Sequence, residues 1–167
     1  MITLFLGGVR SGKSQMAERL ARASSDQVLY VATAVGDPSM ADRIAAHQIR
    51  RPAAWETMEV SMDQMFDALD TKQGCVLVDS LGAWLAQYDD LDADGNRLCK
   101  HLGRRRGDTI IVSEEVGLSV HPVSEVGRRF QDQLGRLNQL VAAQADRSYL
   151  VAAGQVVELS DPPWDEV

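Results

Sequence analysis

The sequence predicts an α/β protein built on a mostly parallel sheet, and three observations support this fold class. Near-continuous apolar runs of strand length alternate with segments whose apolar residues recur at helical spacing. A glycine-rich stretch, residues 7–14, joins the first of these runs to the first helical segment. A later run, residues 75–79, ends in the carboxylate of Asp79. Strands that alternate with helices in this way favour a parallel central sheet flanked by helices.

A chain of 167 residues is long enough for one substantial core and too short for two, and it shows no linker or repeat, so we expect one domain spanning residues 1–167. The predicted strands are residues 2–6, 28–33, 55–60, 75–79, 109–113, 147–153 and 156–159, the last of them as an antiparallel edge near the C-terminus. The predicted helices are residues 15–23, 38–51, 62–69, 80–88 and 125–145.

The polar residues 89–96 predict a solvated loop. The spacing of the acidic residues in it imitates a calcium-binding loop, but the twelfth position is His101, where a bidentate Glu is required. In the long helix of residues 125–145, helical spacing predicts one buried apolar face. That face consists of Val126, Phe130, Leu134, Leu137 and Val141.

The glycine-rich stretch has the form G-x-x-x-x-G-K-[ST], which is typical of P-loop NTPases. It consists of Gly7, Gly8, Val9, Arg10, Ser11, Gly12, Lys13 and Ser14. Its glycines let backbone N–H groups approach a polyphosphate, Lys13 reaches the outer phosphates, and the Ser14 hydroxyl is placed to bind magnesium. Asp79, at the end of its strand, matches a Walker B acid that ligates the same ion. We therefore expect a RecA-like P-loop fold that binds a nucleoside triphosphate with magnesium.

Composition narrows the class of protein. There are 24 acidic and 17 basic residues, a net charge of -7, which disfavours nucleic acid as a partner. No apolar run approaches the ~20 residues of a membrane span. Cys75 and Cys99 are isolated thiols, and the chain enters a strand at once without a signal peptide, so the cytoplasm is the expected compartment. Cys75 is expected to be a small core residue.

A phosphate loop alone does not specify the reaction, and His47 is the second candidate for chemistry. It follows Ile44 by three residues and precedes Arg50 by three, so on a helix all three share a face. A neutral imidazole beside Arg50 and Arg51 suits a nucleophile at phosphorus, because the cations offset the phosphate charge. A histidine that is merely packed and hydrogen-bonded is the alternative.

Several stretches lie in one order along nearly the whole chain. They are GGVRSGKS, VLYVAT, MADRIAAHQIRRPAAWETME, CVLVDSLGAWLA, IVSEEVG followed by HP, and RRFQDQLGRLNQLVAAQAD. Together they resemble the bifunctional adenosylcobinamide kinase / adenosylcobinamide-phosphate guanylyltransferase family. The most specific part is R-I-x-x-H-x-x-x-R-P-x-x-W-x-T-x-E, in which His47 aligns with the histidine that this family guanylylates.

The resemblance implies two reactions. In the first, the triphosphate held by residues 7–14 with magnesium passes its γ-phosphoryl group to a hydroxyl of adenosylcobinamide, with Lys13 and Asp79 assisting. In the second, His47 takes GMP from GTP and passes it to adenosylcobinamide phosphate, giving adenosylcobinamide-GDP in cobalamin biosynthesis. Whether ATP or GTP is the kinase donor stays open. The resemblance also implies a homotrimer, and it places Thr33, Arg51 and Glu59 near the nucleotide.

The chain departs from the family pattern after residue 113. Where the family has Asn-Glu-Val-Gly and a further Gly two residues on, this chain has Glu114 at the Asn position and Ser119 at the later Gly position. This affects the expected corrinoid side of the site and the efficiency of the kinase reaction. Two alternatives remain: a P-loop kinase of another small alcohol without guanylyl transfer, and a nucleotide-binding regulatory module.

Overall fold

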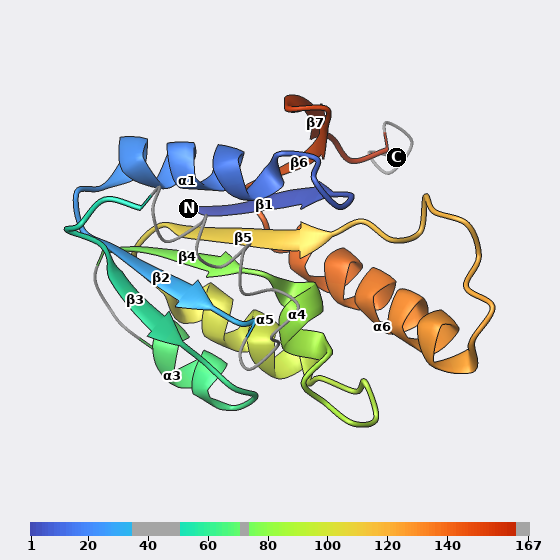
Figure 1. Ribbon diagram of the computed structural model, residues 1–167. Coiled ribbons are helices and arrows are strands. Elements are labelled where there is room, and N and C mark those ends of the chain that lie inside the picture. Colours follow the sequence, from blue (N-terminus) through green and yellow to red (C-terminus); the bar gives the residue numbers. More distant parts are fainter. Residues whose placement is uncertain (35–50, 71–73, 163–167) are drawn as a thin grey trace.

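The computed structural model describes residues 1–34, 51–70 and 74–162, and in them a seven-stranded sheet carries helices on both faces (Figure 1). The strand order is β3-β2-β4-β5-β1-β6-β7. All neighbouring strands pair in parallel except β6 and β7, which are antiparallel. The strands are β1 Ile2–Gly7, β2 Val28–Ala32, β3 Glu56–Glu59, β4 Cys75–Asp79, β5 Thr109–Glu114, β6 Arg147–Ala152 and β7 Gln155–Leu159. The predicted α/β fold class and its antiparallel edge are confirmed.

The helices of the described residues are divided unequally between the two faces. They are α1 Lys13–Ser24, α3 Gln64–Leu69, α4 Leu81–Leu85, α5 Gly95–Arg104 and α6 Glu125–Ala142. Helix α1 packs on one face, and α3, α4, α5 and α6 pack on the other (Figure 1). None of these helices is long and apolar enough to cross a bilayer. The predicted helix 38–51 falls almost entirely outside the described residues.

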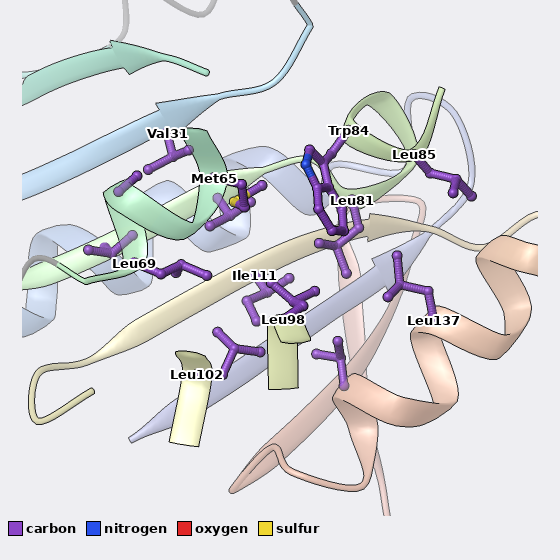
Figure 2. Close-up of a cluster of buried hydrophobic side chains, with 14 of the residues drawn as sticks. Val31, Met65, Leu69, Leu81, Trp84, Leu85, Leu98, Leu102, Ile111 and Leu137 are labelled. Atoms are coloured by element: carbon purple, nitrogen blue, oxygen red, sulfur yellow. The ribbon is translucent and has the colours of Figure 1, made fainter. Parts of the chain in front are cut away.

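The larger core lies between the sheet and the four helices of the second face (Figure 2). Trp84 of α4 is fully buried there, and its Nε1 donates a hydrogen bond to the Met62 carbonyl oxygen at 2.9 Å. Leu98 of α5 and Leu137 of α6 reach the same core. On the other face, Ala17 and other α1 residues cover a second cluster. Because both faces are covered, the central strands appear in the sequence as continuous apolar runs.

Helix α5 lies where the sequence predicts no helix. The polar loop ends at Asp94, whose side chain accepts a hydrogen bond from the Arg97 N–H at 2.8 Å and caps the helix. Leu98 and Leu102 then supply the buried face. The acidic spacing that imitates a calcium loop therefore includes a helix cap.

The predicted buried face of helix α6 is wrong at its first residue. Val126 is 67% exposed, and Asn138 is buried beside Leu134, Leu137 and Val141. The first turn of α6 extends beyond the sheet (Figure 1), so spacing alone overestimates the length of the buried stripe.

Both thiols should resist modification in the folded protein. Cys75 and Cys99 are 3% and 7% exposed, and burial raises the pKa of Cys75 to about 11. A thiol with that pKa is only ~0.1% thiolate at pH 8, and the thiolate is the reactive form. We expect Ellman's reagent at pH 8 to label fewer than ~0.1 thiols per native chain and both thiols after unfolding in guanidinium. Stoichiometric labelling of the native chain would contradict this burial.

Candidate functional site

The phosphate loop joins β1 to α1 in a conformation that requires glycine at two positions. Gly12 caps α1 with a φ of +98°, a left-handed geometry that favours glycine. A Cβ at Gly7 would lie 2.6 Å from the Val151 carbonyl oxygen of β6. A Cβ at Gly8 would meet no atom within 4 Å. Gly7 and Gly12 are thus needed for the fold of the loop itself, whereas Gly8 leaves space beside it.

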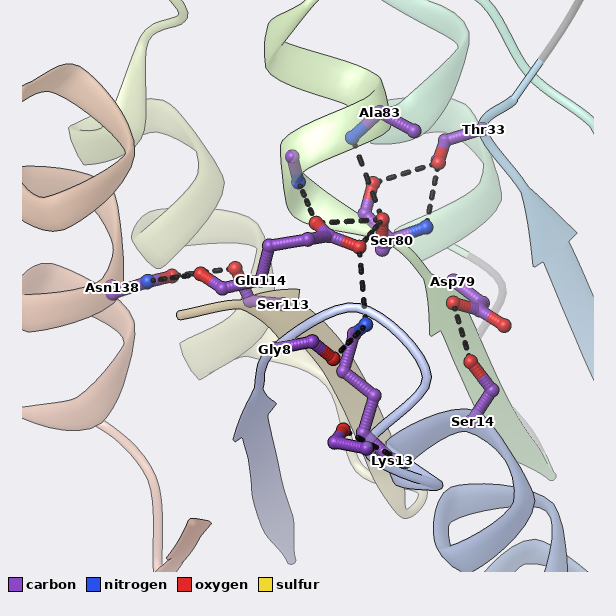
Figure 3. Close-up of polar contacts among 12 residues, drawn as sticks. Gly8, Lys13, Ser14, Thr33, Asp79, Ser80, Ala83, Ser113, Glu114 and Asn138 are labelled. Carbon is purple, nitrogen blue, oxygen red and sulfur yellow. Dashed lines mark hydrogen bonds and ion pairs between the residues drawn. The ribbon is translucent and has the colours of Figure 1, made fainter. Parts of the chain in front are cut away.

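Lys13 is buried at the centre of the loop. Its side chain is 4% exposed, and its Nζ donates to the Gly8 carbonyl oxygen at 3.4 Å and forms an ion pair with Glu114 Oε1 at 3.5 Å (Figure 3). Val9, by contrast, is 74% exposed, and Arg10 has a φ of 58°. The ammonium group therefore lies inside the loop, where the outer phosphates of a bound nucleotide are expected.

Asp79 lies beside the loop as the sequence predicts, although β5 separates its strand from β1. Ser14 Oγ donates to Asp79 Oδ1 at 3.3 Å, and Tyr30 Oη donates to Asp79 Oδ2 at 2.7 Å. Burial, reinforced by the Asp79 charge, raises the pKa of Tyr30, so its hydroxyl stays protonated and remains a donor. Both oxygens of Asp79 are thus oriented by neighbours on α1 and β2.

The pair formed by Ser14 and Asp79 fits a magnesium ion. Magnesium prefers hard oxygen ligands and is usually bound by one or two protein groups, with phosphates and water completing six positions. A hydroxyl and a carboxylate oxygen 3.3 Å apart at the start of α1 provide two such ligands next to the phosphate loop. The residues present therefore suit the ion that the phosphate loop implies.

Tyr30→Phe tests the orientation of Asp79. Phenylalanine keeps the buried ring but removes the donor to the carboxylate, and a hydrogen bond to a charged group contributes about 1.5–3 kcal/mol. We expect a loss of about 2 kcal/mol in the free energy of unfolding and about tenfold weaker magnesium-dependent nucleotide binding. Chemical denaturation and calorimetry measure these two quantities. Tyr88→Phe, a half-buried ring whose hydroxyl makes no hydrogen bond to the described residues, is the control; equal effects of both variants would contradict the role of Tyr30.

Of the other predicted nucleotide residues, Thr33 and Glu59 lie at the carboxyl ends of β2 and β3, and Arg51 lies over the ring of Tyr30. Thr33 is fully buried, and its Oγ1 donates to the Ser80 carbonyl oxygen and accepts from the Ser80 N–H, each at 2.7 Å. The guanidinium carbon of Arg51 lies 3.4 Å from the centre of the Tyr30 ring. Glu59 is exposed at the end of β3. His47 and Arg50 lie outside the described residues.

Besides Tyr30, the structure adds Ser80 and Asn138, which the sequence did not indicate as site residues. Ser80 donates through Oγ to Glu114 Oε1 at 2.9 Å and caps α4, and Asn138 Nδ2 donates to the Glu114 carbonyl oxygen at 3.0 Å (Figure 3). A signal for Asn138 existed, because it lies four residues after Leu134 on the apolar face of its helix and a buried amide needs partners. For Ser80 the signal was its place directly before a short apolar helix.

Comparison with known proteins extends over nearly the whole chain. The model of a family described as cobinamide kinase / cobinamide phosphate guanyltransferase matches residues 3–159. The bifunctional adenosylcobalamin biosynthesis protein CobP of Pseudomonas aeruginosa is 41% identical in an alignment of 172 positions that covers 98% of this chain and 99% of that protein. The proteins named bifunctional adenosylcobalamin biosynthesis protein CobU in Escherichia coli and Salmonella typhimurium are 33% and 32% identical, each over 95% of this chain and 99% of its own length.

Among solved structures, the P4 protein of bacteriophage φ6 in complex with ADP matches with a TM-score of 0.47 and 16% sequence identity. The match covers 93% of this chain and 52% of that one.

Proposed function

The chain belongs to the cobinamide kinase / cobinamide phosphate guanyltransferase family, and we propose that it phosphorylates adenosylcobinamide and then transfers GMP to the product. The observation that carries this proposal is the grouping of Lys13, Ser14 and Asp79 around one phosphate loop, in a chain that matches the family from residue 3 to residue 159. Residues 1–167 act as a single nucleotide-binding domain, and the protein works in the cytoplasm without nucleic acid as a partner.

In the kinase step the triphosphate of ATP or GTP occupies the phosphate loop. The hydroxyl oxygen of adenosylcobinamide bonds to the γ-phosphorus, the bond from that phosphorus to the β–γ bridging oxygen breaks, and the hydroxyl proton is lost to solvent. Lys13 binds the outer phosphate oxygens, on which negative charge builds up. Ser14 and Asp79 would hold magnesium, which would offset phosphate charge.

In the transferase step His47 attacks the α-phosphorus of GTP and expels pyrophosphate. A phosphate oxygen of adenosylcobinamide phosphate then displaces the imidazole and forms adenosylcobinamide-GDP. Covalent catalysis replaces one displacement between two anions with two displacements at a preformed site. The position of Arg51 supports a role for His47 at this site. Arg51 stacks on the ring of Tyr30, whose hydroxyl contacts Asp79. His47 is four residues before Arg51, and four residues of extended chain span at most about 14 Å.

Other residues complete the proposed nucleotide site. The buried Nε of Arg51 has no hydrogen-bond partner among the described residues, which suits a group that contacts phosphate together with Arg50. Thr33 holds the end of β4 at this edge, and the exposed Glu59 can accept hydrogen bonds from a guanine edge.

We also propose a homotrimer. The segment after β5 extends away from the sheet (Figure 1), and Leu118, Val120 and Val123 in it are 81%, 92% and 96% exposed. A contact between copies would bury these apolar side chains, which is the usual reason for several large apolar side chains to gather on a surface.

Product analysis tests the proposed function directly. The purified protein is incubated with adenosylcobinamide, magnesium and either ATP or GTP, and the corrinoids are separated and weighed. We expect adenosylcobinamide phosphate with a suitable donor and adenosylcobinamide-GDP only when GTP is present. Phosphate transfer without GMP transfer would favour a kinase alone. Nucleotide binding without either product would favour a regulatory module.

A further inference from the structure

Glu114, at the end of β5, has a position that the proposed reactions do not explain. Among the described residues it forms the only ion pair of Lys13, with 3.5 Å between Glu114 Oε1 and Lys13 Nζ. The Lys13 side chain is 4% exposed and that of Glu114 is 24% exposed. A buried ammonium group needs a compensating charge, and Glu114 supplies that charge here.

The Glu114 carboxylate is held independently of Lys13. Ser80 Oγ lies 2.9 Å from Oε1 and 3.0 Å from Oε2, and the Gly82 N–H donates to Oε2 at 3.0 Å. A side chain at Gly82 would collide with the carboxylate, so this glycine leaves the space that the carboxylate occupies. Asn138 of α6 binds the Glu114 carbonyl oxygen at 3.0 Å (Figure 3). Contacts from α4 and α6 therefore fix both ends of this residue.

The arrangement has a consequence for a bound triphosphate. Lys13 is a flexible side chain that can turn toward phosphate oxygens, whereas Glu114 stays where Ser80 and Gly82 hold it. Binding of the nucleotide therefore replaces a carboxylate with phosphate as the partner of Lys13, and it leaves a fixed negative charge beside the outermost phosphate. A diphosphate lacks that phosphate and meets less repulsion.

We propose that Glu114 is the counter-ion that Lys13 exchanges for the outer phosphates, and that its fixed carboxylate weakens the binding of triphosphate more than that of diphosphate. This inference rests on the proposed function, because it describes the same phosphate loop. Glu114 pairs with Lys13 and repels the outermost phosphate through its charge, so it determines nucleotide preference and is not a catalytic residue. It lowers the preference of the loop for an unreacted triphosphate over the diphosphate product of the kinase step.

Glu114→Gln is the sharpest test, because it removes the charge and keeps the size and the acceptor for the Gly82 N–H. Calorimetry with magnesium measures the Kd of guanosine 5′-(β,γ-imido)triphosphate and of GDP for this variant and for the unmodified protein. We expect the triphosphate analogue to bind about tenfold more tightly to the variant and GDP to change by less than about threefold. The gain for the triphosphate analogue should shrink as the salt concentration rises.

Glu115→Gln is the matched control, since it removes the same charge from the next residue. Glu115 Oε1 accepts hydrogen bonds from the N–H groups of Gly117 and Leu118, at 2.6 and 3.2 Å, and it does not contact Lys13. The control should bind both nucleotides like the unmodified protein. Unchanged or weaker triphosphate binding in Glu114→Gln, or an equal gain in the control, would overturn the inference while the proposed function stands. Failure of the unmodified protein to bind either nucleotide would overturn both.

Discussion

His47→Ala is expected to abolish the covalent GMP adduct that the unmodified protein forms with GTP and magnesium. If the imidazole is the nucleophile, the variant has no other group that can form the bond to the α-phosphorus, and adduct formation falls by about 10³-fold or more. Intact-mass spectrometry of the incubated protein measures the gain of one GMP, which acid treatment should remove because a phosphorus–nitrogen bond is acid-labile. Phosphorylation of adenosylcobinamide by the same variant should continue, because that step uses the phosphate loop.

His121→Ala is the control for this experiment. Of the three histidines in the chain, His101 pairs with Asp70 at 2.8 Å, whereas His121 is exposed and makes no hydrogen bond to the described residues. The His121 variant should form the adduct at the normal rate. An adduct that persists in His47→Ala would assign the nucleophile to another residue. A protein that never forms the adduct yet makes adenosylcobinamide phosphate would be a kinase alone.

Asp79→Asn should have the second largest effect, and it should affect both reactions. The amide keeps a similar shape and can still accept from Tyr30, but it removes the negative charge from the pair with Ser14. Because a neutral amide oxygen binds magnesium more weakly than a carboxylate, we expect kcat/KM of the kinase step to fall by about 10²- to 10³-fold, and adduct formation to fall with it. Steady-state assays over a magnesium titration measure the loss, and higher magnesium should restore part of the activity.

The control for Asp79 is Asp26→Asn, which removes the same charge from the exposed turn before β2, at the opposite end of the sheet. That variant should keep normal activity. Equal losses in the two variants would point to net charge as the cause. Normal activity of Asp79→Asn would remove Asp79 from the magnesium site.

Features that depend on short stretches of sequence could be predicted. The central strands are continuous apolar runs because helices cover both faces of the sheet, and the phosphate loop is recognisable because its backbone conformation requires glycine at fixed positions. The position of Asp79 follows from the rule that parallel strands end at one edge of the sheet. The cap that Asp94 provides for α5 involves a residue only three positions further along the chain, but the polar residues around Asp94 predict a loop and hide it.

Features that depend on contacts between distant residues could not be predicted. Tyr30 lies 49 residues from Asp79, and its hydroxyl gave no local signal because a tyrosine in a buried strand looks like an apolar residue. In the sequence Glu114 appears only as a departure from the family pattern, because its pairing with Lys13 depends on β5 lying next to β1. The exposure of Val126 depends on how far α6 extends beyond the sheet, which helical spacing does not encode.

The position of β1 between β5 and β6 affects the order in which the protein matures during synthesis. Ile2 pairs with Thr109, Thr3 pairs with Arg147, and the Gly154 N–H donates to the Ser11 carbonyl oxygen at 2.8 Å. The phosphate loop leaves the ribosome before its partners on β5 and β6, which emerge only after more than 100 further residues. The bond between Ile2 and Asp146 spans a similar separation. Nascent chains that stop before β6 therefore lack the backbone contacts that support the phosphate loop. We expect nucleotide binding to begin only after the β6–β7 hairpin has docked against β1.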